Sequence, residues 1–374
     1  MASVIPDLKA LRKEAEDALV SRLSRIAELV PGQWVGREGG TSFDPSYHLT
    51  AKFRITRGAG RGQEWWLQAL IKKEIYPKQA RLAILDLKKG SSSVGGVPVY
   101  PILIAPHITE GVAELCREEE VGFLDLAGNC HLFFGGIWVD IRGNEKAYRV
   151  NQALKSVFSP KASRLLRLLL QGPLRAWKVE ELATRAGISI GLVSRVRQVL
   201  LKEEWAEEVN GGIVVTQADK ILRKWLASDD FFKRTKVQEY STLSSGDELA
   251  TRLVETLSGS EQKPLFTLNY AAWLRAPHNV PSVVSAYVEE FPSDGELEAA
   301  LGARPVQRGA GNLRLLKHSD HHALTIDERV DTQRPNLTMV SDLQLYLDLN
   351  QAEPNGPEQA EVLRKKEDFS GGWS

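Results

Sequence analysis

Cysteines, long apolar runs and a net charge are what this 374-residue sequence lacks. Its two cysteines, Cys116 and Cys130, are too few for a disulfide framework and for a zinc site of the usual type. No apolar run approaches the roughly 18 residues that a membrane-spanning helix needs. The N-terminal segment also lacks the apolar core of a signal peptide, so we expect a cytoplasmic protein.

What is present is an ordinary globular composition, with 43% hydrophobic and 26% charged residues. The 48 basic and 48 acidic side chains cancel, which argues against a non-specific polyanion binder. Their distribution along the chain is uneven. From Lys155 to Lys202, ten basic residues are accompanied by only two acidic ones, Glu180 and Glu181, whereas the sequence after residue 236 is acidic. This pattern indicates that the middle of the chain contacts phosphate.

The periodicity of apolar residues predicts α/β, helical and α+β segments in that order along the chain. We therefore predict an α/β and α+β multidomain protein with domains at residues 1–150, 155–236 and 237–374. In the first domain we expect an amphipathic helix within residues 1–30, further helices at 76–90 and 108–120, and strands at 48–56, 64–73, 99–105, 121–127 and 130–141. The last residues, 365–374, are predicted to be a frayed tail.

The middle segment carries the pattern of a winged helix. Ser159 and Pro160 begin a helix, a second helix ends at Gly187, and a third begins after Ser189. Two short helices joined by a glycine-containing turn form a helix-turn-helix. The sequence AEEV-NGG-IVVT that follows predicts a hairpin, because Asn-Gly supplies the positive φ angles of a tight turn.

The third helix of this segment, the second of the helix-turn-helix, is the predicted DNA-reading element. Val193, Val196 and Leu200 share one face of that helix and would be buried, so the opposite face would point outward. Polar side chains of this kind bind base edges and phosphates in the major groove. We predict that six residues contact DNA: Ser189, Ser194, Arg195, Arg197, Gln198 and Lys202.

Several stretches resemble the AbiEi-type antitoxins of type IV toxin-antitoxin (abortive-infection) systems. They are FSPKASRLLRLLLQGP, ATRAGISIGLVSRVRQVL, YSTLSSGDELATRLVETL and MVSDLQLYLDL, within about residues 155–369. The resemblance implies a winged helix that represses its own operon, with Ser194, Arg195 and Gln198 at the operator. It also implies a C-terminal domain that opposes a nucleotidyltransferase-like toxin encoded nearby.

The order of elements in residues 1–150 resembles the core of restriction endonucleases. Those enzymes hold a metal with a carboxylate two positions before a lysine on one strand, together with an acidic residue on a neighbouring strand. In EWWLQALIKK the lysine would be Lys72 or, in the other register, Lys73, and the carboxylate position is then occupied by Leu70 or Ile71. We therefore predict a domain that is not catalytic, with Asp44 and Glu64 as alternative metal ligands outside the usual pattern.

Two polar stretches are candidates for chemistry. Within VGFLDLAGNCHLFF, Cys130 and His131 are adjacent on a strand and would point to opposite faces, so a nucleophilic pair is not expected. Asp125 and Asn129 suit a turn, although a polar sheet end that contacts nucleotide is the alternative. The run HSDHH, with His318, His321 and His322, is interpreted as a polar turn between two strands, with metal binding as the alternative.

Taken together, these patterns predict a DNA-binding transcriptional regulator. We expect it to act within a defence or toxin-antitoxin operon, with duplex DNA as partner, no cofactor, no enzymatic activity and a homodimer as one possible assembly. The alternatives are a metal-dependent nuclease directed to DNA by its winged helix, and an interaction scaffold that does not bind DNA.

Overall fold

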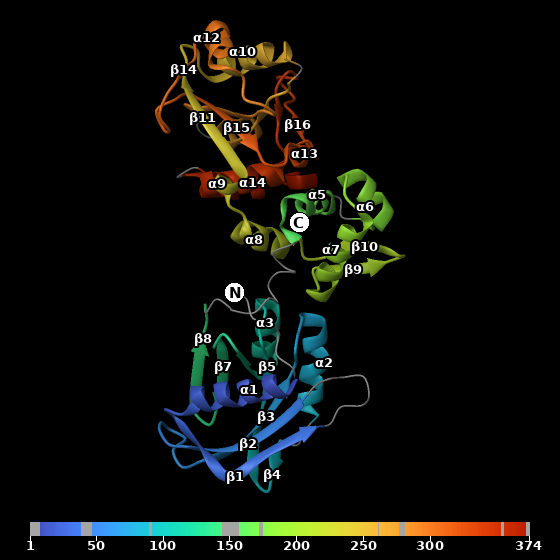
Figure 1. Cartoon of the computed structure of the whole chain (residues 1–374), viewed down its shortest axis with the longest axis vertical. Helices are drawn as coiled ribbons and strands as arrows, with labels where there is room; N and C mark the ends of the chain where they lie inside the picture. Colours follow the sequence, from blue (N-terminus) through green and yellow to red (C-terminus); the bar gives the residue numbers. More distant parts are fainter. Residues whose placement is uncertain are drawn as a thin grey trace. The chain divides into compact units, whose positions relative to one another are not determined.

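The computed structural model describes residues 8–38, 47–89, 92–143, 157–171, 175–260, 262–276, 281–352 and 355–371. The chain divides into two units (Figure 1). The first comprises Met1–Ala153 with Lys202–Glu204, and the second comprises Leu154–Leu201 with Trp205–Ser374. Almost all of the predicted segment 155–236 and all of 237–374 therefore belong to one unit. Among the described residues, no helix combines the length and apolarity required to cross a membrane.

The first unit is built on an eight-stranded mixed sheet. Its strands are β1 (Ala27–Glu38), β2 (Tyr47–Ile55), β3 (Glu64–Ile71), β4 (Ser93–Val94), β5 (Val97–Ala105), β6 (Gly122–Asp125), β7 (Cys130–Phe134) and β8 (Ile137–Ile141). They are ordered β1-β2-β3-β5-β6-β7-β8, and β4 pairs with β5 alone. The neighbours β3, β5 and β6 run parallel, while the strands at either side of them pair antiparallel.

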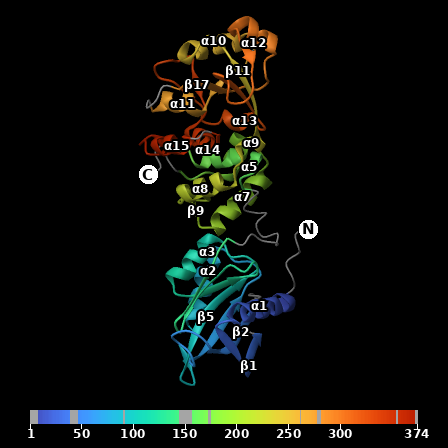
Figure 2. The same ribbon diagram turned by 90° about the vertical axis from the view of Figure 1, so that its left-hand side faces the viewer.

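Helices cover both faces of this sheet, which gives three layers. Helix α1 (Leu8–Leu23) packs its buried leucines against one face, beside Ala69 and Ile102. Helices α2 (Pro77–Lys88) and α3 (Glu110–Glu118) pack against the other face, beside Leu70 and Leu103. Because side chains alternate along a strand, consecutive residues of β3 and β5 serve two separate cores. Figure 2 shows α1 and the pair α2 and α3 on opposite sides of the sheet.

The prediction of a helix within residues 1–30 is correct only in part. The helix ends at Leu23, and β1 begins four residues later at Ala27. Ala27 pairs with Ile55 and Leu29 pairs with Phe53, so the backbone of this segment is hydrogen-bonded to β2. The apolar spacing of Ile26, Leu29 and Val30 is compatible with a helix. The segment from Ala27 is nevertheless a strand, because its backbone pairs with β2.

The N-terminal part of the second unit contains the three helices and the hairpin predicted for the middle segment, followed by two helices, α8 (Ala218–Ser228) and α9 (Phe231–Arg234), that were not predicted. The predicted elements are α5 (Pro160–Leu169), α6 (Val179–Ala186), α7 (Ile190–Lys202) and the hairpin strands β9 (Ala206–Val209) and β10 (Gly212–Val215). Residue Trp177 adds a bridge to Ile213 of the hairpin, with its N–H donating to the Ile213 carbonyl at 3.0 Å.

The remainder of the second unit is an α+β layer around a seven-stranded sheet. In sheet order, the strands are β14 (Arg304–Pro305), β11 (Thr235–Ser241), β15 (Leu313–His318), β13 (Val284–Tyr287), β12 (Leu265–Phe266), β17 (Thr338–Met339) and β16 (Arg329–Val330). The helices are α10 (Gly246–Ser258), α11 (Leu268–Arg275), α12 (Asp294–Leu301), α13 (His321–Leu324), α14 (Asp342–Ala352) and α15 (Gly356–Arg364). Tyr346, Leu347 and Leu349 of α14 are buried.

The prediction of a frayed tail from Lys365 is wrong for its described part. Phe369 is 1% exposed and lies edge-on to the ring of Tyr346, with 6.1 Å between ring centroids. Ser370 is also buried, and its hydroxyl donates to the carbonyl of Leu170 at 3.0 Å. Burial of one aromatic ring together with this hydrogen bond is sufficient to order a polar segment.

Candidate nucleic-acid interface

Helices α6 and α7 are joined by the turn that the sequence predicts. Gly187 ends α6 in the left-handed region, with φ 62° and ψ 41°, a conformation that glycine adopts without a steric penalty. The hydroxyl of Ser189 accepts a hydrogen bond from the Leu192 N–H at 3.3 Å, so Ser189 caps α7. Ser189 is exposed, and its side chain is used for this cap.

Helix α7 has a buried face and an exposed face. Val193, Val196 and Leu200 are buried as predicted. On the opposite face Arg195 and Gln198 are exposed and Ser194 is partly exposed. The Arg195 Nε donates to the Gly191 carbonyl at 3.3 Å, and the side chain forms no ion pair with any residue that the structure describes. Because Arg195 is exposed, its two terminal nitrogens are accessible to an external acceptor.

The other two residues of α7 predicted to contact DNA are Arg197 and Lys202. The guanidinium of Arg197 lies 2.5 Å from the carboxylate of Glu208 on β9, so its charge is balanced within the chain. Lys202 is the last residue of α7 and is partly exposed. The sequence pattern does not reveal the Arg197 pair, because the hairpin that brings Glu208 to α7 forms only in the folded unit.

The basic excess between Lys155 and Lys202 is partly balanced within the protein. Arg164 pairs with Asp320 at 2.6 Å, and Arg167 donates to Gln344 at 2.6 Å. Arg175 pairs with Glu181, and its guanidinium stacks on Trp177 at 3.5 Å from the ring centroid. Lys155 lies outside the described residues. The exposed cations of this segment are Lys161, Arg175, Lys178, Arg185 and Arg195.

The hairpin that follows α7 is acidic. Glu207 and Glu208 are exposed on β9, and Asn210 and Gly211 form its turn with φ angles of 50° and 74°. An acidic strand is repelled by phosphate. The surface of this segment that is suited to nucleic acid is therefore the outer face of α7 with the neighbouring exposed cations.

In the first unit, the described residues considered as metal ligands are buried in the core or already paired with cations. Leu70 is buried against α2 and α3, so the usual carboxylate position is part of the core. Glu64 pairs with Lys52 at 2.5 Å and with Arg54 at 2.7 Å, and these hydrogen bonds lower the pKa of its carboxyl group. Asp44 lies outside the described residues.

The stretch VGFLDLAGNCHLFF is organised as a turn between β6 and β7. The buried carboxylate of Asp125 accepts from the Asn129 N–H and from its side-chain amide, both at 2.9 Å. Cys130 lies in the core beneath α1, whereas His131 stacks on Phe123 on the opposite face of the sheet. A Cys130–His131 pair is therefore excluded by strand geometry, as predicted.

The histidine run follows β15 and begins the short helix α13. His318 is 6% exposed and its Nδ1 accepts from the Asp320 N–H at 2.9 Å. Burial, aided by the nearby charges of Arg234 and Arg167, lowers the pKa of His318 to about 3. Within the described ranges, no group of three or more His, Cys, Asp or Glu side chains could hold a metal ion.

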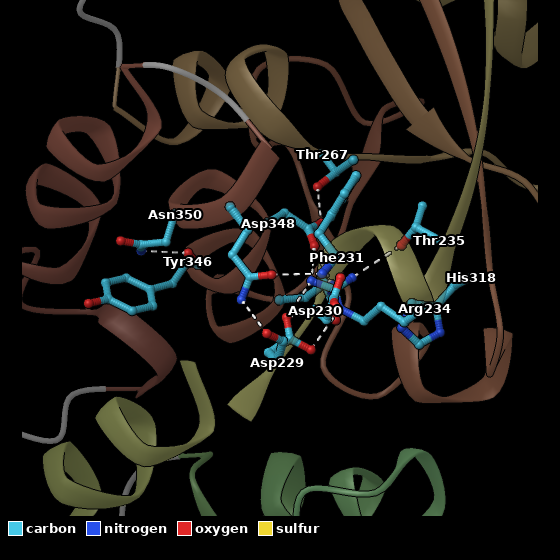
Figure 3. Close-up of polar contacts among 12 residues, drawn as sticks. Asp229, Asp230, Phe231, Arg234, Thr235, Thr267, His318, Tyr346, Asp348 and Asn350 are labelled. Atoms are coloured by element: carbon cyan, nitrogen blue, oxygen red, sulfur yellow. Dashed lines mark hydrogen bonds and ion pairs between the residues drawn. The ribbon is translucent and has the colours of Figure 1, made fainter. Parts of the chain in front are cut away.

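Sequence reasoning missed a buried polar cluster in the second unit, which we call the Asp348 cluster (Figure 3). The carboxylate of Asp348 is fully buried and accepts hydrogen bonds from four side chains, which are Arg234 at 2.8 Å, Thr267 at 2.6 Å, Tyr287 at 3.1 Å and Gln344 at 2.6 Å. Burial opposes the charge of the Arg234 guanidinium. The neighbouring Asp348, Tyr287 and Asp229 nevertheless raise the pKa of Arg234 well above its ordinary value. No regular spacing links these residues.

The Asp348 cluster also connects the two halves of the second unit. Gln344, which donates to Asp348, accepts from the buried Arg167 of α5. Arg167 lies over the ring of Trp225 of α8, 5.0 Å from its centroid. These contacts connect α5, which precedes α6 and α7, and α8, which follows them, to α14.

The outer face of α7 carries the polar side chains of Ser194, Arg195 and Gln198, whose donor and acceptor groups are of the types that bind base edges. Comparisons with protein-family models, curated proteins and solved structures find no match to this chain. A functional assignment therefore depends on the chemistry of the chain's own residues.

Proposed function

We propose that this protein is a sequence-specific DNA-binding transcriptional regulator in which α7 enters the major groove. The observation that carries the proposal is the division of α7 into a buried face and an outer face with Arg195 and Gln198. An arginine pairs with the O6 and N7 atoms of guanine, and a glutamine pairs with the N6 and N7 atoms of adenine.

The element order around α7 supports a winged helix. Helices α5, α6 and α7 are followed by the hairpin β9–β10, and Trp177 pairs with Ile213 of the hairpin through a single β-bridge. Because the hairpin is acidic, we propose that recognition relies on α7 and that the wing does not follow the phosphate backbone. Lys178 and Arg185 of the α6 region are exposed and would contact phosphates at the flank.

We further propose that the protein regulates its own toxin-antitoxin or defence operon in the cytoplasm. This part depends on the resemblance to AbiEi-type antitoxins over residues 155–369, which implies that a nucleotidyltransferase-like toxin is a partner. Helix α14, with the QLYLDL sequence, packs in the core and joins α5 through Gln344. A partner bound to the C-terminal layer would thus act on a unit that also contains α7.

The first unit is proposed to be a restriction-endonuclease-like domain without catalysis. Its order of helix α1, the antiparallel strands β1 to β3, helix α2 and a strand β5 parallel to β3 supports this assignment. Leu70 replaces the carboxylate that would hold a metal beside Lys72.

The test uses the full-length chain and the duplex that it selects from a random library. Binding is measured by fluorescence anisotropy over a range of salt concentrations, and affinity is expected to fall steeply with salt because phosphate contacts release counterions. Arg195→Ala should weaken the preferred site by about 1–3 kcal/mol. Arg308→Ala, which removes an exposed arginine in the loop after β14, is the matched control.

The losses on different sequences distinguish the possible roles of Arg195. A loss confined to the preferred site supports base reading, whereas an equal loss on all sequences reassigns Arg195 to phosphate. Unchanged binding on every duplex would refute α7 as the DNA-reading helix.

A further inference from the structure

One part of the sheet in the first unit exposes aromatic rings. Trp65, Phe134 and Ile137 contribute to the core beneath α1, so their neighbours along each strand point to the opposite face. These neighbours are Trp66 on β3, Phe133 on β7 and Trp138 on β8, which we call the aromatic patch. They share a sheet face with α2 and α3.

Helices α2 and α3 do not cover the aromatic patch. Trp138 is 72% exposed and Phe133 is 60% exposed, and their rings meet edge to face with 6.3 Å between centroids. Trp66 is partly exposed, and the Lys52 ammonium lies 5.8 Å from its ring centroid. Figures 1 and 2 show that the strands extend beyond α2 and α3. Single exposed apolar side chains are common, whereas two adjacent aromatic rings that are both more than half exposed offer a flat apolar surface to a partner.

A loop with two arginines lies against the turn between Phe133 and Trp138. This loop, residues 56–63, joins β2 to β3 and carries Arg57 and Arg61. A Cβ on Gly60 would lie 2.0 Å from the carbonyl oxygen of Gly135, so the loop and the turn touch through their backbones. This close approach requires glycine at position 60.

Cations outnumber carboxylates near the aromatic patch, and Asp140, on the same strand face as Trp138, is paired with Arg142 at 2.6 Å. Arg57 and Arg61 are exposed, and neither forms an ion pair with another residue that the structure describes. Lys52 and Arg54 lie on the same sheet face and both pair with Glu64, and Arg54 also lies 3.9 Å from the carboxylate of Glu28. Exposed aromatic rings bordered by unpaired cations are complementary to a chain of unstacked bases and phosphates.

We propose that this face binds single-stranded nucleic acid, with bases stacked on Phe133 and Trp138 and phosphates bound by Arg57 and Arg61. A base pair inside a duplex cannot offer its ring face to a protein side chain, so the surface would discriminate against duplex. The proposal goes beyond the proposed function, because its ligand is single-stranded and not duplex nucleic acid, and because it involves no residue of α7.

The experiment compares two fluorescein-labelled ligands of equal length, an oligothymidylate and an abasic oligodeoxyribose phosphate, with the full-length protein. The oligothymidylate should bind more tightly, because only it can stack. Trp138→Ala should weaken oligothymidylate binding about five- to 150-fold and leave abasic binding unchanged. Trp138→Phe should restore most of the affinity.

Further variants separate the contributions. Arg57→Ala combined with Arg61→Ala should weaken both ligands and reduce the salt dependence of binding. Leu85→Ala removes an exposed apolar side chain from α2 and should change neither ligand. Arg195→Ala, which tests the duplex-binding helix, should also leave oligothymidylate binding unchanged, so the two proposals fail independently.

Two results would overturn the proposal. The first is equal affinity for oligothymidylate and the abasic chain in the native protein. The second is an association of the protein with itself, seen by light scattering, that Trp138→Ala abolishes without any effect on oligothymidylate binding. That result would assign the aromatic patch to a second copy of the chain.

Discussion

Replacement of Asp348 by alanine is expected to destabilise the second unit strongly. The side chain is fully buried and is the acceptor shared by Arg234, Thr267, Tyr287 and Gln344. Its removal leaves the buried guanidinium of Arg234 with one fewer counter-charge, and it leaves the donors of Thr267 and Gln344 without their acceptor.

The magnitude follows from these partners. Removing one member of a buried ion pair costs about 3–5 kcal/mol, because the other charge stays buried. Asp229 remains in contact with Arg234 at 2.9 Å and offsets part of this loss. Each neutral donor left without an acceptor adds about 1 kcal/mol. The two donors add about 2 kcal/mol and the retained Asp229 pair offsets about the same amount, so we expect Asp348→Ala to lower the free energy of unfolding by about 3–5 kcal/mol.

Hydrogen exchange of the α14 backbone amides measures this change within the second unit. A loss of about 3 kcal/mol corresponds to exchange that is roughly 150-fold faster. The matched control is Asp219→Ala, which breaks the 2.6 Å pair with Arg364 at a position where Asp219 is 54% exposed. Exposed pairs contribute about 0–1 kcal/mol. A loss for Asp348→Ala no larger than that of the control would refute the account of the cluster.

Two further predictions concern acid stability and cleavage. Because burial lowers the pKa of His318 to about 3, the unfolded chain binds a proton below about pH 6.5 that the folded chain does not, so stability should fall as the pH drops from about 6.5 towards 3. His318→Asn should flatten this part of the pH dependence in urea unfolding, and an unchanged slope would exclude His318 as its source. Incubation of the native protein with plasmid and Mg²⁺ or Mn²⁺ should yield no cleavage, since Leu70 replaces the metal-binding carboxylate. Cleavage that Lys72→Ala abolishes would show that another acid, with Glu64 or Asp44 as the first candidates, completes a site.

Local patterns predicted most elements of the first unit and the three helices and hairpin between Ser159 and Thr216. Gly187 and Ser189 bounded α6 and α7, and the spacing of Val193, Val196 and Leu200 correctly identified the buried face of α7. The alternation of side chains likewise separated Cys130 from His131. These predictions succeed because helix caps, turns and strand alternation depend on residues within one or two turns of chain.

Contacts between distant residues had to come from the tertiary structure. Sequence alone determined that α7 has an outward polar face, but only the fold showed that Arg197 is balanced by Glu208 and that Arg164 is balanced by Asp320. A count of charges along the chain treats every cation as available to an external phosphate. Which cations are neutralised depends on acids brought near by folding, and the Coulomb energy depends on distance in space, not on separation along the chain.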